Sequence, residues 1–441
     1  MSTDDVKTIE PLSGPLSGSC VVPGDKSISH RAVLFSAMAE GASRLSGVLD
    51  SSDVRASINA VRKLGAEVTL EKQPDGSLSG GVVGWGAKGP KQPDGPIYCA
   101  NSGTTARLLM GILAPWDIKV KITGDESLSR RPMRRITAPL MKMGVSFDPA
   151  GAETLPIVER GTRDLRAISY DSPMASAQLK TAVLLAGVYA NGTTTVNEPS
   201  TSRNHTELML PEFGVETTAS ELSASVNGPA ALKSCEVVVP GDPSSAAFLI
   251  CAALLKKGSA IQIENVSLNT ARTGFFRTLE RMGADIEVHR TGSSGKEPFG
   301  VMSACYSGKL RGCEVPGSKI ASLVDEVPVL ALVAAFARGV TVFRDAGELR
   351  AKETDRLTAV RNGLAQLGVD SWIEGDDLFV EGNPDLEIPD GIVFDSLGDH
   401  RLAMTWSLVG LTGEKPVGIK NFSCVDVSYP DFLKDIERLV R

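Results

Sequence analysis

One sequence pattern is repeated six times along the chain. Each copy contains a small polar cluster, an apolar helical run, a turn, a β-branched strand and a second polar loop. An amphipathic helix follows, which ends in Gly-Ala or Gly-Val in all copies but the last. The turn positions recur roughly every 65–80 residues, at Gly41, Trp116, Gly192, Gly258, Gly339 and Gly413. That length accommodates two helices and several strands, so we expect six copies of one α/β unit.

The first repeat shows why the pattern should fold in this way. Its first apolar run has near-helical spacing after a candidate N-cap, Ser29, and Gly41 provides a residue that tolerates positive φ where the helix ends. The second helix should stop at Gly65. Its apolar stripe consists of Val54, Ile58, Val61 and Leu64.

The phrase VPGD occurs twice, at residues 22–25 and 239–242, and divides the repeats into two groups of three. A chain of 441 residues also exceeds what one core usually organises. We therefore predict a first domain of residues 23–239 and a second of residues 240–441 with the N-terminal residues 1–22. The chain would cross between them twice, near 22–24 and 239–241, which favours a cleft that closes on its ligands.

Charge and composition exclude several classes of function. The net charge is -7 and the pI is near 5.4, whereas nucleic acids and anionic membranes require a basic face. The chain has no run of about 18 apolar residues and no signal peptide, so we expect a cytoplasmic protein that does not bind membranes. The seven cysteines lack C-x-x-C spacing and the four histidines lack HExxH spacing, so neither disulfides nor a metal is expected.

Polar clusters precede the first helix of the repeats, where helix N-termini favour anions. In GDKSISHR, Lys26, Ser27 and Arg31 add two cations and a hydroxyl, although a solvated N-cap remains an alternative; no Walker loop is present. The second repeat offers the donor-rich stretch 101–105, in which Gly103 allows close backbone approach; an ordinary turn into a helix is the alternative.

Four arginines lie within residues 129–135, a run that fits either a solvated face or an anion clamp. Further polar clusters of the later repeats are Ser176-Ala177-Gln178, Ser202-Arg203-Asn204-His205, Lys352-Glu353-Thr354-Asp355-Arg356 and Asp399-His400-Arg401, together with Asp325. If the six repeats are alike, these clusters occupy equivalent ends of their repeats and can converge on one cleft. The clusters contain many cations, which indicates that two phosphorylated or carboxylated ligands bind there. Two carboxylates lie among the cations, Asp325 and Glu353, and they could act as acid and base.

The sequence resembles the 5-enolpyruvylshikimate-3-phosphate (EPSP) synthase family over essentially its whole length. The motifs that carry the resemblance occur in the family's order: PGDKSISHRA, NSGTTARL, RRPM, PMASAQLK, SRNHTE, DEVPVLA, RAKETDRL and GDHRLAM. The resemblance implies an α/β fold of two domains, each of three βαββαβ units, as in the enolpyruvyl transferases, which form an inside-out α/β barrel.

The resemblance also implies an activity. The family, 3-phosphoshikimate 1-carboxyvinyltransferases, transfers the enolpyruvyl group of phosphoenolpyruvate to the 5-hydroxyl of shikimate 3-phosphate and releases phosphate. The reaction belongs to the shikimate pathway, which leads to chorismate and the aromatic amino acids. The resemblance further implies that no organic cofactor and no metal is needed, that glyphosate is an inhibitor, and that the protein is a monomer.

Site residues follow from the matching motifs. The resemblance implies catalytic roles for Asp325, Glu353 and Lys26. Asp325 is our candidate base on the substrate hydroxyl, and Glu353 and Lys26 would manage the protons of the carbon and the phosphate. It implies shikimate 3-phosphate binding by Lys26, Ser27, Arg31, Ser176, Ala177, Gln178, Ser202, Arg203, Asp325, Glu348 and Lys352. It implies phosphoenolpyruvate binding by Lys26, Asn101, Gly103, Arg131, Gln178, Arg356 and Arg401.

The chain departs from the family pattern in places. The phrase before Tyr429 lacks a lysine that some members have, which removes one phosphoenolpyruvate contact. Ala177 and SRNHTE are typical of a more divergent, often glyphosate-tolerant branch, and Leu108 replaces a proline common in sensitive members. Gly103 is nevertheless the small residue associated with sensitivity, so we predict measurable inhibition by glyphosate.

Two alternatives remain, a related enolpyruvyl transferase and a protein of another class. A UDP-N-acetylglucosamine enolpyruvyl transferase shares the fold but uses a reactive cysteine in its second repeat, where this chain has TGDESLSRRPM without Cys. A non-catalytic anion-binding repeat protein would release no phosphate when both substrates are mixed.

Overall fold

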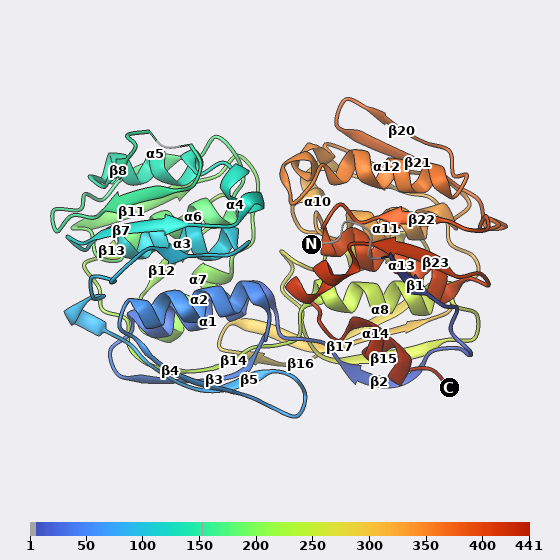
Figure 1. Cartoon of the computed structure of the whole chain (residues 1–441), viewed down its shortest axis with the longest axis horizontal. Coiled ribbons are helices and arrows are strands. Elements are labelled where there is room, and N and C mark those ends of the chain that lie inside the picture. The colour runs from blue at the N-terminus through green and yellow to red at the C-terminus, as the bar shows by residue number, and fades with distance from the viewer. Residues whose placement is uncertain (1–5, 152) are drawn as a thin grey trace. The chain divides into compact units, whose positions relative to one another are not determined.

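The computed structural model describes residues 6–151 and 153–441, which form two lobes, each with its own buried core (Figure 1). The first lobe consists of Pro23–Pro240 and Ser293–Glu297. The second consists of the chain up to Val22, Gly241–Gly292 and Pro298–Arg441. The short segment Ser293–Glu297 lies outside the predicted first domain of residues 23–239 but groups with the first lobe.

The first lobe contains the first three repeats and one further strand. Its helices are α1 (Lys26–Met38), α2 (Ser52–Lys63), η1 (Gly86–Lys88), α3 (Gly103–Leu113), α4 (Glu126–Arg130), α5 (Arg134–Met143), α6 (Ala177–Gly187), α7 (His205–Met209) and η2 (Leu210–Phe213). Its strands are β3 (Ala42–Val48), β4 (Glu67–Lys72), β5 (Leu78–Val83), β6 (Ile97–Tyr98), β7 (Lys119–Thr123), β8 (Ser146–Asp148), β9 (Ile157–Arg160), β10 (Ser169–Asp171), β11 (Gly192–Asn197), β12 (Thr217–Ala219), β13 (Ser223–Gly228) and β14 (Glu236–Val238).

The second lobe contains the last three repeats and the two N-terminal strands. Its helices are α8 (Pro243–Leu255), α9 (Gly274–Arg281), α10 (Gly317–Ile320), α11 (Val327–Ala335), η3 (Ala346–Ala351), α12 (Arg356–Gln366), α13 (His400–Thr412), η4 (Phe422–Val427) and α14 (Phe432–Arg438). Its strands are β1 (Val6–Ile9), β2 (Ser17–Val21), β15 (Ala260–Ser267), β16 (Asp285–Ser294), β17 (Glu297–Cys305), β18 (Glu314–Val315), β19 (Gly339–Phe343), β20 (Ser371–Glu374), β21 (Asp377–Gly382), β22 (Val393–Asp395) and β23 (Val417–Lys420). The turn of the β16–β17 hairpin is the segment that groups with the first lobe.

The described residues form six sheets, one for each repeat; five have four strands, and the sheet of the sixth repeat has three. In every sheet the strand after the first helix of the repeat is paired with a parallel strand on one side and an antiparallel strand on the other. The predicted fold class, an α/β protein of two three-repeat domains, is therefore confirmed.

Two strands each precede the first helix of one repeat but pair with the sheet of another repeat. Strand β2 comes directly before α1 but pairs with β15 in the second lobe, while β14 comes before α8 but pairs with β3 in the first. In the sixth repeat, β1 supplies the antiparallel partner of β23. This exchange completes the first and fourth sheets with strands from distant parts of the sequence.

The first helix of each repeat is buried and forms the core of its lobe. In α11 all nine residues are buried, and α3 and α6 lie side by side in the first lobe (Figure 1). A helix that is apolar all round is stable only inside a core, because each buried Leu or Phe contributes about 1.5–3 kcal/mol. The second helices, such as α2, bury one stripe only. No helix in the described part of the chain has both the length and the apolar character needed to span a membrane.

The prediction for the start of the first helix was wrong. Helix α1 begins at Lys26 with Asp25 as its N-cap, because the Asp25 carboxylate accepts a hydrogen bond from the Ile28 amide at 2.9 Å. The Ser29 hydroxyl instead accepts one from the Leu49 amide at 2.9 Å. The second helix ends as predicted, with Gly65 at φ +99° just beyond it, and it begins at Ser52 after the N-cap Ser51.

Candidate active site

The N-terminus of α1 holds two of the predicted cations in different ways. Lys26 is partly exposed, and its ammonium lies 3.4 Å from the Asp53 carboxylate. Arg31 is buried and donates to the hydroxyls of Thr206 at 2.8 Å and Thr181 at 2.9 Å, and to the Ser27 carbonyl at 2.9 Å. These three acceptors are uncharged. They fix the guanidinium in place through neutral hydrogen bonds, while its charge interacts at longer range with carboxylates that include Glu207.

The pKa values of Arg31 and His30 show which residues carry the positive charge of α1. Burial lowers the pKa of Arg31 to about 10, against the opposing effect of carboxylates that include Glu207. Burial also lowers the pKa of His30, helped by the neighbouring Lys26 and Arg31. His30 is therefore neutral near neutral pH, and the Nδ1 atom of its ring lies 2.8 Å from the Ser57 hydroxyl. The positive charge of this helix terminus comes from Lys26 and Arg31.

The arginine run of the second repeat does not form a single clamp. Arg130 and Arg134 are exposed and pair with the surface carboxylates of Glu126 and Glu153. Arg131 instead contacts Asn101: its Nη2 donates to the side-chain oxygen and its Nη1 lies 3.4 Å from the backbone oxygen. Of these three arginines, only Arg131 joins the residues predicted to bind phosphoenolpyruvate.

Gly103 is the first residue of α3 and faces an arginine that the sequence analysis did not single out. Arg107, one turn further on, is buried and donates to the side-chain oxygen of Gln178 at 2.6 Å. Gln178 in turn donates to the Thr104 hydroxyl at 3.0 Å. A Cβ at position 103 would lie 2.8 Å from Arg107 Nη1 and 3.6 Å from Arg131 Nη1. Glycine is therefore required if Arg107 is to keep this position.

The third repeat brings together two predicted phosphate-binding segments. Ser176 is the N-cap of α6, and Ser202 lies in the loop before α7, the loop that also carries Arg203. A buried carboxylate, Glu198, accepts from the Ser176 amide and the Ser202 hydroxyl, both at 2.8 Å. It also pairs with buried Lys180 at 2.8 Å. Glu198 and Lys180 were missed in the sequence.

In the second lobe, Arg356 is fully buried at the start of α12 among three carboxylates. Asp399 accepts from its Nε at 2.7 Å and from its Nη2 at 3.2 Å. Asp325 accepts from Nη1 at 3.0 Å and Glu353 from Nη2 at 2.7 Å. Burial would lower the pKa of Arg356, but the carboxylates, Asp399 foremost, outweigh that effect and raise it. Two of the three carboxylates are the predicted catalytic residues.

Arg401, in the first turn of α13, is the second buried arginine of this cluster. Its guanidinium lies 3.7 Å from the Asp325 carboxylate and 3.6 Å from that of Glu326. Asp325 therefore lies between two predicted phosphoenolpyruvate-binding arginines. At the edge of the cluster, the Lys352 ammonium lies 2.5 Å from Glu348.

The structure thus places the predicted residues in two sets, one in each lobe. The first lobe carries Lys26, Ser27, Arg31, Asn101, Gly103, Arg131, Ser176, Ala177, Gln178, Ser202 and Arg203. The second carries Asp325, Glu348, Lys352, Glu353, Arg356 and Arg401. Three further residues, Arg107, Glu198 and Asp399, hold members of these sets in place. Arg107 stands inside the quoted motif NSGTTARL, a signal that could have found it, whereas Asp399 was named in the polar cluster Asp399-His400-Arg401 without a role.

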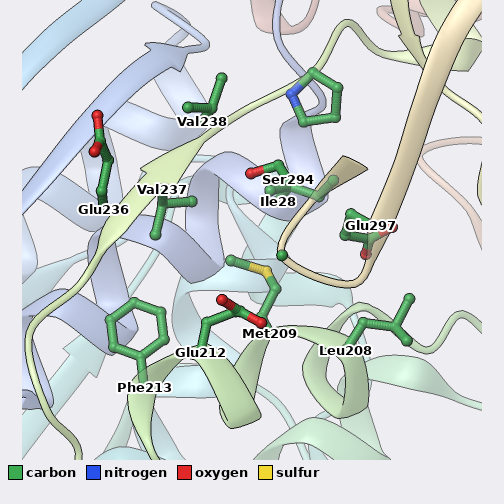
Figure 2. Close-up of a pocket in the computed structure, with 12 residues that line it drawn as sticks. Ile28, Leu208, Met209, Glu212, Phe213, Glu236, Val237, Val238, Ser294 and Glu297 are labelled. Carbon is green, nitrogen blue, oxygen red and sulfur yellow. The ribbon is translucent and has the colours of Figure 1, made fainter. Parts of the chain in front are cut away.

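A mostly apolar pocket in the first lobe is separate from these sets. Figure 2 shows it beside the turn of the β16–β17 hairpin, with Met209 and Phe213 among its lining residues. Glu297, from the same turn, is buried and lies 2.5 Å from His205. None of the predicted site residues lines this pocket.

The fold is that of the enolpyruvyl transferases, and each lobe carries buried arginines among the predicted site residues. An EPSP synthase structure from Acinetobacter baumannii superimposes with a TM-score of 0.87 at 38% identity, covering 98% of both chains. The enolpyruvyl transferase NikO from Streptomyces tendae has a TM-score of 0.78 at 20% identity, which shows the shared fold.

Sequence comparison identifies the family. The profile of the family described as EPSP synthase (3-phosphoshikimate 1-carboxyvinyltransferase) matches residues 11–436. A 3-phosphoshikimate 1-carboxyvinyltransferase from Bacillus pumilus is 42% identical over 97% of this chain and 98% of its own length. One from Parvibaculum lavamentivorans is 44% identical over 96% and 94%. The chain belongs to the EPSP synthase family.

Proposed function

We propose that this chain transfers the enolpyruvyl group of phosphoenolpyruvate to the 5-hydroxyl of shikimate 3-phosphate and releases phosphate. The observation that carries this function is the similarity to 3-phosphoshikimate 1-carboxyvinyltransferases, which extends over nearly the whole of both chains. Two sets of buried, oriented arginines support it, since both substrates are phosphorylated anions.

We assign the substrates to residues as the family resemblance implies. Shikimate 3-phosphate would contact Lys26, Ser27, Arg31, Ser176, Ala177, Gln178, Ser202, Arg203, Asp325, Glu348 and Lys352. Phosphoenolpyruvate would contact Lys26, Asn101, Gly103, Arg131, Gln178, Arg356 and Arg401. The neutral partners of Arg31 support its role, because they satisfy its hydrogen bonds without neutralising its charge.

The chemistry has two steps. The 5-hydroxyl oxygen bonds to C2 of phosphoenolpyruvate and loses its proton, while C3 gains a proton and becomes a methyl group. The tetrahedral adduct then loses a methyl proton, the C2–O bond to phosphate breaks, and the enol ether forms. Asp325 would accept the hydroxyl proton, and Glu353 and Lys26 would transfer the others.

The surroundings of Asp325 support and complicate this role. Two arginines flank its carboxylate and attract its charged form, which a base requires. The same contacts mean that Asp325 also holds Arg356 and Arg401. A substitution of Asp325 should therefore affect both proton transfer and phosphoenolpyruvate binding.

A phosphate-release assay with the full chain tests the proposed function. Phosphate should appear only when both substrates are present, and a product with the mass of 5-enolpyruvylshikimate 3-phosphate should accumulate in equal amount. Replacing shikimate 3-phosphate with UDP-N-acetylglucosamine should give no release. Binding of both substrates without phosphate release would instead support a non-catalytic anion-binding protein.

Several finer expectations belong to the same proposal. We expect a monomer in the cytoplasm, no organic cofactor or metal requirement, and measurable inhibition by glyphosate. Ligand-induced closure also stays a prediction. Small-angle scattering tests it, since the radius of gyration should fall when both ligands are added.

A further inference from the structure

We propose that Glu198 is a positioning residue for the phosphate of shikimate 3-phosphate, with Lys180 as its buried counter-ion. The inference rests on the proposed function and goes beyond the predicted contact residues. It follows from the hydrogen bonds that join Glu198 to two separate segments of the third repeat.

The backbone of Glu198, the residue that follows β11, is anchored independently of its side chain. Its backbone amide donates to the Leu222 carbonyl at 2.8 Å, which anchors it to the chain just before β13. The residue is buried, so its carboxylate requires partners for its charge. The side chain is thus held from the sheet side and directed to α6 and the loop before α7.

One carboxylate oxygen orients the start of α6. Glu198 Oε1 accepts from the Ser176 amide at 2.8 Å, and the Ser176 hydroxyl accepts from the Leu179 amide at 3.3 Å. With both its amide and its hydroxyl oxygen fixed, Ser176 keeps a hydroxyl proton that it can donate to a ligand.

The other oxygen orients the loop. Glu198 Oε2 accepts from the Ser202 hydroxyl at 2.8 Å. A phosphate that binds Ser202 must accept this same proton, so it replaces Glu198 as the acceptor. Glu198 therefore holds the hydroxyl in place until the phosphate arrives.

Lys180 reduces the repulsion between Glu198 and an anionic ligand. Its ammonium lies 2.8 Å from Glu198 Oε2 and 2.8 Å from Glu207 Oε1, and it is buried one turn along α6 from Ser176. Without this cation, a buried carboxylate beside the site would repel a phosphate. When the phosphate takes the Ser202 proton, Glu198 keeps its ion pair and the Ser176 amide.

The test compares Glu198→Gln with the wild type by steady-state kinetics and by calorimetric binding of shikimate 3-phosphate and of shikimate. Glutamine keeps the shape but loses the charge and places an amide donor near Lys180 or Ser202. We expect the KM and Kd for shikimate 3-phosphate to rise about tenfold. The KM for phosphoenolpyruvate, kcat and shikimate binding should change less than about twofold.

Two further variants separate positioning from a structural role. Glu198→Asp retains the charge and should recover part of the lost affinity for shikimate 3-phosphate. Glu216→Gln removes an exposed carboxylate from the same repeat and should change neither KM. If Glu198→Gln fails to fold, Glu198→Asp replaces it in all comparisons, with a smaller expected rise.

A double-mutant cycle with Ser202→Ala gives the sharpest readout. If Glu198 acts partly through Ser202, the two substitutions together should weaken binding of shikimate 3-phosphate by less than the product of their separate effects. Fully multiplicative effects, an equal rise in both KM values or no rise would overturn the inference. Absence of phosphate release by the wild type would instead refute the proposed function, while the binding measurements would still decide the role of Glu198.

Discussion

Substitution of Asp399 probes the buried cluster of the second lobe most directly. Asp399 is fully buried and accepts two hydrogen bonds from Arg356, at 2.7 and 3.2 Å. It is also the N-cap of α13, where it accepts from the Arg401 amide at 2.9 Å. Asp399→Ala removes all three interactions, whereas Asp399→Asn keeps a capping oxygen and removes the charge.

The expected loss of stability follows from these contacts. Breaking a buried ion pair by removing one partner costs about 3–5 kcal/mol. Arg356 keeps Asp325 and Glu353, so we take the lower end, about 3 kcal/mol. Loss of an N-cap adds about 1 kcal/mol. Asp399→Ala should therefore lower the free energy of unfolding by about 4 kcal/mol, and Asp399→Asn by only about 1–2 kcal/mol, because its cap remains.

Urea unfolding of the full chain measures this difference. Far-ultraviolet circular dichroism follows the whole molecule, and tryptophan fluorescence includes Trp406, which is fully buried on α13. The transition that reports the second lobe should shift to lower urea in the order wild type, Asn variant, Ala variant. Equal shifts for the two variants, or a loss below about 1 kcal/mol for Asp399→Ala, would refute the reasoning.

Three further predictions concern the site and the core. Asp325→Asn should lower kcat at least a hundredfold and raise the KM for phosphoenolpyruvate, because the carboxylate is both the candidate base and a partner of Arg356; near-normal kcat in the phosphate-release assay would contradict its role as base. Gly103→Ala should raise the glyphosate concentration for half-inhibition and the KM for phosphoenolpyruvate, since the added Cβ would lie 2.8 Å from Arg107 Nη1; unchanged inhibition would count against this steric argument. Burial raises the pKa of Glu159, whose carboxylate oxygens have no hydrogen-bond partner among the described residues. Because the folded-state pKa lies above the unfolded value, the contribution of protonated Glu159 to stability should be lost as pH rises above about 4.5, so the melting temperature of the Glu159→Gln variant should rise relative to that of the wild type over this range. Parallel curves for the two proteins would exclude this effect.

Much of the fold and of the candidate site could be predicted from local sequence. The apolar stripe from Val54 to Leu64 and the stop at Gly65 depend only on neighbouring residues, and α2 ends as they predict. Two of the quoted motifs lie at helix starts, since Lys26 is the first residue of α1 and Arg356 the first residue of α12. The N-cap of α1 was placed wrongly because Asp25 and Ser29 are both good caps, and only the backbone path selects one.

The residues that position the site could not be found in the same way. The carboxylate of Glu198 meets Ser176 only because β11, α6 and the loop before α7 pack together. In the sequence, Glu198 and Lys180 look like ordinary charged residues. A buried ion pair depends on which side chains share a low-dielectric interior, and neighbouring residues do not determine that.

The sequence by itself determined that the chain has six α/β repeats, that they divide into two groups of three, and which polar clusters begin their helices. These features depend on periodicity, turn residues and caps, which act over a few residues. Only the tertiary structure decided that β2 and β14 complete the sheets of distant repeats, and that Asp399 and Glu198 hold the arginine and the serines. Such pairings bring together residues far apart in the chain, and packing and the need to satisfy buried charges select them.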